Sequence, residues 1–203
     1  MTRSIPVRSL ALTAAVAAIL AGSPTAAQAP LAIDTGRITI AGTSNVHDYT
    51  ATTTTVKATR VQFAPGVAGP AFWDEVQKPH ALQAFDIAIP AESLKSPKDG
   101  LDKNMYKALK TKEHPQITFR LARLDGAAGS LKAVGTLTIA GVEREITLPL
   151  TTSRREGGLA VRGAIDVLMT DYGIAPPKAM LGMVKADPKI TVTFEVVLAA
   201  ATT

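Results

Sequence analysis

The amino-acid sequence predicts an all-β fold of about eight antiparallel strands with one short α-helix. Apolar and polar residues alternate with a period of two through most of the chain after residue 30, which is the pattern of half-buried strands. Short turn motifs separate these segments, so we expect neighbouring strands to pair as antiparallel hairpins. About eight strands within residues 30–203 favour a sandwich or a closed barrel, because closure removes exposed strand edges.

The first 29 residues have the three-part pattern of a secretory signal. Two arginines precede the apolar run Leu10–Ala21, and Ala27–Ala29 supplies small residues at a cleavage site. The alternative, a membrane-spanning helix, needs about 20 apolar residues, more than this run contains. We therefore predict a signal peptide at residues 1–29, cleaved near Ala29. The remaining residues 30–203 are expected to form one exported domain, most simply in a bacterial periplasm.

The strands are expected in a regular order along the exported domain. The alternating segments are Ile38–Ile40, Phe85–Ile89, Gln116–Leu124, Ser130–Ala140, Glu145–Leu150, Leu159–Met169 and Lys189–Leu198. The run Thr50–Thr55 has strong β propensity but no apolar parity, so the side that faces inward is not readable there. Turns are expected at Asp125–Gly126 with Gly129, at Ala140–Gly141 and at Glu156–Gly158.

Helical spacing occurs in one segment, Ser96–Lys112. Its apolar and basic residues fall on opposite faces: Leu101, Met105, Ala108 and Leu109 on one, and Lys103, Lys107 and Lys110 on the other. Ser96 and Asp99 resemble an N-cap residue and the acid of a capping box, with Pro97 in the first turn. The alternative is a start nearer Leu101. The lysine face is either an ordinary solvated surface or a contact for anionic lipid headgroups.

Composition excludes most catalytic classes. The chain has no cysteine, which rules out a thiol nucleophile, a Cys-ligated zinc site and an iron–sulfur cluster. His47, His80 and His114 are too far apart in sequence to form a local metal pair, and His47–Asp48 is expected to form a turn. The net charge of +5 does not indicate nucleic-acid binding. We therefore expect no catalytic residues, no metal and no cofactor other than a bound lipid.

Four motifs resemble the YceI-like family. They are Ala41-Gly42-Thr43-Ser44-Asn45-Val46-His47-Asp48-Tyr49, Met105–Leu109 followed by His114–Phe119, Gly135–Val142, and Met169–Ile174. They occur in the family's order and cover nearly the whole exported domain. The resemblance implies an eight-stranded antiparallel lipocalin-like β-barrel that binds polyisoprenoids, such as quinone tails, in an apolar interior. This chain lacks the family's common opening run, HSxVxF. The resemblance therefore implies the mode of binding rather than the identity of the ligand.

The expected function is therefore that of a periplasmic binding or carrier protein for an elongated apolar lipid, a polyisoprenoid or isoprenoid quinone. If the apolar parity faces inward, residues from five strands surround the ligand: Ile117, Phe119, Leu137, Ile139, Ile146, Leu148, Val161, Ile165, Val192 and Phe194. One alternative is a filled barrel with a structural or stress-related role. Another is an accessory to quinone-linked electron transfer.

Overall fold

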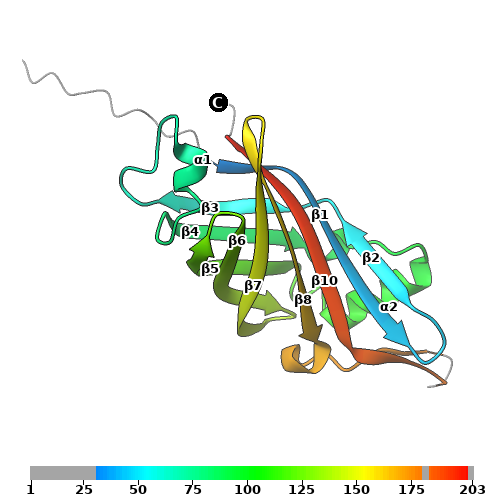
Figure 1. Ribbon diagram of the computed structural model, residues 1–203. Helices are drawn as coiled ribbons and strands as arrows, with labels where there is room; N and C mark the ends of the chain where they lie inside the picture. Colours follow the sequence, from blue (N-terminus) through cyan, green and yellow to red (C-terminus); the bar gives the residue numbers. More distant parts are fainter. Residues whose placement is uncertain (1–30, 180–182, 201–203) are drawn as a thin grey trace, which may run out of the picture.

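The computed structural model describes residues 31–179 and 183–200 and is dominated by long antiparallel strands (Figure 1). The strands are β1 Leu31–Ser44, β2 Tyr49–Thr53, β3 Lys57–Phe63, β4 Leu82–Pro90, β5 Gln116–Ala127, β6 Ser130–Ile139, β7 Val142–Arg155, β8 Gly158–Leu168, β9 Lys178–Ala179 and β10 Val184–Ala200. The helices are α1 Phe72–Glu75 and α2 Asp99–Leu109, with 3₁₀ turns η1 Ala91–Ser93 and η2 Met169–Tyr172. The predicted signal peptide, residues 1–29, lies outside the described residues.

One curled antiparallel sheet forms the wall of the molecule. Its strand order is β2-β1-β10-β8-β7-β6-β5-β4-β3, and β9 pairs separately with β10. The two end strands, β2 and β3, are separated by residues 54–56 only, so the sheet curls round until its edges meet along one stretch of chain. Beside this junction, Thr52 and Lys95 exchange two backbone hydrogen bonds of 2.8 and 2.9 Å. The predicted barrel-like β fold is confirmed, with nine strands in the main sheet rather than eight.

The additional strand is β3, which the alternation did not reveal. Ala58 pairs with Ile87 and Arg60 with Asp86, so β3 carries one more residue than β4 between these pairs. Such a β-bulge shifts the facing of every later residue in the strand. The half-buried Ala58 and Val61 therefore stand three positions apart, and the period of two is lost in the sequence.

The predicted hairpin turns are confirmed at two of three positions. Ala140 and Gly141 have φ values of 49° and 79°, as a two-residue turn of type I′ requires, and Glu156–Gly157 separates β7 from β8. Asp125–Gly126 was wrong as a turn. Both residues lie inside β5, paired with Lys132 and Leu131 of β6. The connection consists of residues 128–129, so only Gly129 of the predicted turn lies in it.

Helix α2 is shorter than the predicted segment and has a different cap. It begins at Asp99, with Lys98 at the N-cap position and no side-chain cap. Asp102, rather than Asp99, reaches back and accepts a hydrogen bond of 2.8 Å from the backbone N–H of Ser96. Asp99 is exposed, whereas Asp102 is 6% exposed, so the buried carboxylate is the one that fixes the start. The helix ends at Leu109, and the next residue, Lys110, has a left-handed φ of 52°.

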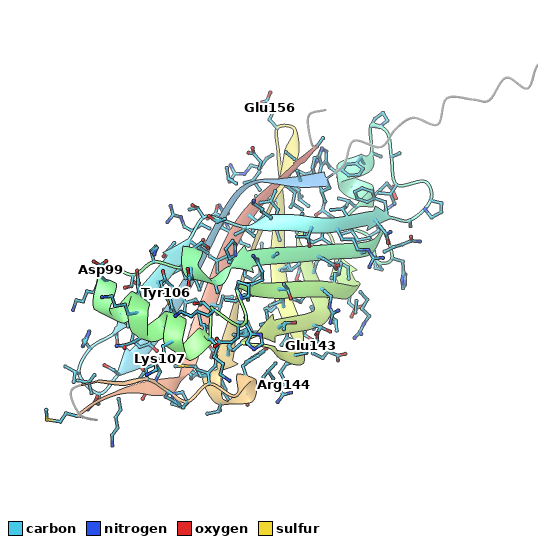
Figure 2. The ribbon with its side chains drawn as sticks, turned by 180° about the vertical axis from the view of Figure 1, so that it is seen from behind. Asp99, Tyr106, Lys107, Glu143, Arg144 and Glu156 are labelled. Carbon is cyan, nitrogen blue, oxygen red and sulfur yellow. The ribbon has the colours of Figure 1, made fainter. Side chains whose placement is uncertain are left out.

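The two helices lie at opposite ends of the barrel (Figure 1). At the α1 end, apolar side chains fill the interior in two clusters, one around Val76, Leu159 and Leu198 and the other around Leu124 and Leu131. Figure 2 shows Glu156 at the tip of the β7–β8 hairpin, far from α2 and from Glu143 and Arg144 of β7. The half of the barrel nearer α2 contains the cavity described next.

Candidate ligand cavity

A cavity of about 390 Å³ occupies the α2 half of the barrel. This volume lies within the range of about 300–1,000 Å³ that is typical of small-molecule sites. Its wall consists of every second residue along each strand, because successive strand residues point to opposite faces of the sheet. On β10 the lining extends from Val184 to Val196, roughly 40 Å of extended strand. The cavity is therefore long as well as apolar.

Nine of the ten residues predicted to surround a ligand line this cavity. They are Ile117, Phe119, Leu137, Ile139, Ile146, Leu148, Ile165, Val192 and Phe194. Val161 does not. It faces inward at the α1 end, where it packs against the cluster of Leu31, Leu159 and Leu198. The alternation placed Val161 on the correct face, but it carries no information on where the interior is filled and where it is open.

The structure adds lining residues that the sequence analysis did not assign to the site. Strands β1, β2 and β4 contribute Ile38, Ile40, Tyr49, Ala51, Ile87 and Ile89, and α2 contributes Leu101, Asn104, Met105, Ala108 and Leu109. Most of these residues could have been assigned from the sequence, because the alternation along the strands and the apolar face of the helix are both visible in it. What was missing is that α2 lays its apolar face over the barrel interior, which is a tertiary relationship.

The interior wall is not packed like a filled core. Ile165 and Val192, which pair across β8 and β10, both face inward and yet are only half-buried. By contrast Leu94, beside α2, is 1% exposed. Close-packed interiors leave few voids larger than a water molecule, so side chains that face inward and remain accessible indicate a hollow barrel.

Polar side chains gather where the cavity meets solvent. His47 and Asn104 are the exposed residues of the described lining, and they mark the mouth between the β1–β2 turn and α2. The predicted turn at His47 is confirmed: the backbone N–H of His47 donates to Ser44 Oγ at 3.1 Å, and its carbonyl accepts from Ser44 Oγ at 2.7 Å. Asn45 ties this turn to β10, since its side-chain amide donates to Met183 O and accepts from the N–H of Lys185, both at 2.8 Å.

Two tyrosines, Tyr49 and Tyr172, also line the cavity. Burial raises the pKa of Tyr49, and Asp187 raises it further. Burial likewise raises the pKa of Tyr172, reinforced by Asp171 and opposed by the nearby Arg144. Both phenols therefore stay protonated and neutral at ordinary pH, and they add hydrogen-bonding capacity to the cavity without adding charge.

The charged groups are on the outer face of the sheet. Asp166 of β8 is exposed and accepts hydrogen bonds from Thr191 Oγ1 at 2.7 Å and Lys189 Nζ at 3.2 Å. These bonds, that from Thr191 first, lower the pKa of the carboxyl. Arg120 and Glu143 form a similar exposed pair at 2.6 Å. Such pairs stabilise the surface only slightly and leave the interior uncharged.

The other two histidines lie away from any candidate chemistry. The ring of His114 packs over Gly141 in the β6–β7 turn, where a Cβ at Gly141 would lie 2.7 Å from Nε2. His80 is exposed in the connection before β4, with a φ of 65°. In residues 31–179 and 183–200, no group of three or more His, Asp or Glu side chains is placed to hold a metal ion. No helix in these ranges is long and apolar enough to cross a membrane.

Comparisons with known proteins identify relatives of the whole described chain. A family model described as the YceI-like domain matches residues 31–198. Burkholderia cenocepacia BcnA is 16% identical, with a TM-score of 0.62 over 82% of this chain and 96% of that chain. A polyisoprenoid binding domain from Saccharophagus degradans is 13% identical, with a TM-score of 0.61 over 84% of this chain and 98% of that chain.

A third similar structure is a Campylobacter jejuni YCEI protein. It is 20% identical, with a TM-score of 0.54 over 73% of this chain and 82% of that chain. No curated protein matches this chain. At these identities the structural likeness shows a shared fold.

Proposed function

Because the chain belongs to the YceI-like family, we propose that it is a binding or carrier protein for an elongated apolar lipid with a polyisoprenoid tail. The observation that carries this proposal is the long apolar cavity, open at one mouth between the β1–β2 turn and α2. A tail placed there is removed from water over its whole length. At about 25 cal/mol per Å², each 55 Å² or so of buried apolar surface strengthens binding about tenfold, before the cost of ordering the tail.

The isoprenoid class is supported by the relative from Saccharophagus degradans, which has the same fold and is named for polyisoprenoid binding. The cavity itself favours a slender, uncharged chain, since its lining is almost entirely aliphatic. His47, Asn104 and the two tyrosine hydroxyls offer hydrogen bonds to a neutral headgroup. A quinone ring would fit this chemistry, and a role beside quinone-linked electron transfer is the second candidate function.

The test is to purify the exported protein from its native cells under mild conditions and to identify the lipid that organic solvent extracts from it. We expect a prenyl lipid in near-stoichiometric amount, found by mass spectrometry. Delipidated protein should take the same lipid up again. A redox-active headgroup in the extract would favour the electron-transfer candidate. Protein that yields no lipid, and that takes up no prenyl alcohol after delipidation, would contradict the proposal.

Loading requires contact with a membrane, and we assign that contact to the exposed lysines of α2. Lys103, Lys107 and Lys110 are exposed, on a helix whose apolar face lines the cavity (Figure 2 labels Lys107). Each basic residue near an anionic surface contributes about 1 kcal/mol, so replacing all three with Gln should weaken binding to vesicles by about 100-fold. Lys132→Gln, on β6 near the filled end, is the control. Vesicle binding insensitive to both salt and the triple change would show that α2 is an ordinary solvated helix.

The proposed location is the periplasm. It depends on the secretory signal predicted at residues 1–29. A periplasmic carrier would meet membrane surfaces on either side of that compartment. Fractionation of the native cells tests this proposal, and full-length protein retained in the inner membrane would contradict it.

A further inference from the structure

Three inward-facing glycines lie in the wall of the barrel, and a side chain from elsewhere in the wall covers each of them. A Cβ built on Gly135 of β6 would lie 2.7 Å from Cζ of Phe119, and one on Gly163 of β8 would lie 2.9 Å from Cε1 of Phe194. On β1, Gly36 is covered by Val56, at 3.2 Å. Part of each phenyl ring therefore occupies space that only a glycine leaves free.

The side chains that cover these glycines, Phe119, Phe194 and Val56, line the inner end of the cavity. Phe119 is the last residue of β5 to line the cavity, and the next inward residues, Leu121 and Leu124, belong to a filled cluster. On β10 the lining ends at Val196, and the next inward residue, Leu198, packs in the cluster at the α1 end. Phe119, Phe194 and Val196 thus form a floor that separates the open half of the barrel from the filled half.

We propose that this floor, Phe119 and Phe194 above all, sets the longest lipid tail that the protein accepts. The inference rests on the proposed function, because it concerns how the same cavity selects its ligand. The mouth lies at the polar residues His47 and Asn104, so an amphiphilic lipid enters tail first and leaves its headgroup there. The terminal isoprene unit then meets the phenyl rings, and a longer tail has to leave carbon atoms outside the mouth.

Substitutions can move the floor in both directions. Phe194→Ala and Phe119→Ala remove a ring and extend the cavity toward the α1 end, so longer tails become acceptable. Val192→Phe places a ring two residues nearer the mouth than Phe194, which shortens the accessible length by roughly 7 Å. Substituting the glycines is less informative, because a Cβ at Gly163 would also collide with the carbonyl oxygen of Pro149.

The experiment measures binding of linear prenyl alcohols that differ by one isoprene unit, using delipidated protein and native mass spectrometry. In the wild type, affinity should rise with each unit and stop rising at a defined length. The break should move to longer alcohols, by at least one unit, in Phe194→Ala and Phe119→Ala, and to shorter ones in Val192→Phe. Ile139→Ala is the matched control, since it removes a wall residue that packs with the α2 side chains, away from the floor, and should leave the break in place.

The outcomes separate this inference from the proposed function. If the wild type shows a break that none of the three floor variants moves, while they remain folded by circular dichroism, the floor assignment is overturned and the carrier function stands. If Ile139→Ala moves the break as far as Phe194→Ala does, cavity volume rather than floor position controls length, and the inference is again overturned. If no prenyl alcohol binds to the wild type, both the inference and the carrier function fail.

Discussion

Ile165→Trp tests whether the open part of the barrel holds a lipid. Ile165 faces the cavity on β8 and pairs with Val192 of β10, so an indole at this position lies across the tube about halfway along it. Between Val192 and the floor at Phe194 lie roughly 7 Å of lining that a tail could no longer reach. The variant should therefore lose lipid while it keeps its fold.

The magnitude follows from the blocked length. At about 1.25 Å per carbon along an extended chain, roughly 7 Å corresponds to about five carbons. Each is worth about 0.8 kcal/mol when buried, a gross loss of about 4 kcal/mol. The tail that stays outside also avoids its ordering cost, so we expect a net loss of at least about 1.4 kcal/mol, or about tenfold in affinity.

The assay compares the lipid extracted from each protein with the melting temperature of the same protein after delipidation, because bound lipid itself raises the melting temperature. In a hollow barrel the indole occupies free space, so the melting temperature should change little. In a filled core it would overpack the interior at a cost of about 1–3 kcal/mol, or roughly 2–12 °C in a protein of this size. Ala164→Trp, on the outer face of the same strand, is the control for the ring itself. Normal lipid content in folded Ile165→Trp, or the large thermal loss of a filled core, would refute the reasoning.

Leu137→Trp, from β6, should exclude lipid in the same way, and lipid content measured beside Ile165→Trp checks it. Replacing all three histidines with Asn should leave lipid affinity within a few-fold of the wild type; a large loss in a folded variant would give one of them a role in binding. Asp102→Ala should lower the free energy of unfolding by about 1 kcal/mol near neutral pH. Hydrogen bonds from Ser96 lower the pKa of the Asp102 carboxyl, so this difference should be complete above the unfolded-state pKa and vanish as the pH falls through the folded-state pKa. Urea unfolding across an acid series measures it, and a pH-independent difference would contradict the assignment. The mature protein should begin within a few residues of Pro30, and amino-terminal sequencing of native material checks the predicted cleavage.

The sequence by itself determined which side chains face the interior. Alternation is a local property with a period of two, and it survives wherever a strand is regular. Residues such as Leu137 and Ile165 could therefore be assigned to the inner face from a few neighbours. The strand class, most hairpins and the amphipathic helix follow from similarly local patterns. Where a bulge interrupts the period, as at Thr59 in β3, the local pattern fails and the strand was missed.

Only the tertiary structure decided where the inner face is filled and where it is open. Val161 and Ile165 share one parity on β8, yet Val161 is packed and Ile165 lines the cavity. The difference arises because Phe194, on another strand, covers Gly163 between them. Likewise Asp102 rather than Asp99 holds the start of α2, because the chain bends Ser96 back toward it. Such contacts depend on strand register and chain path, and these are set by the whole sheet rather than by the residues on either side.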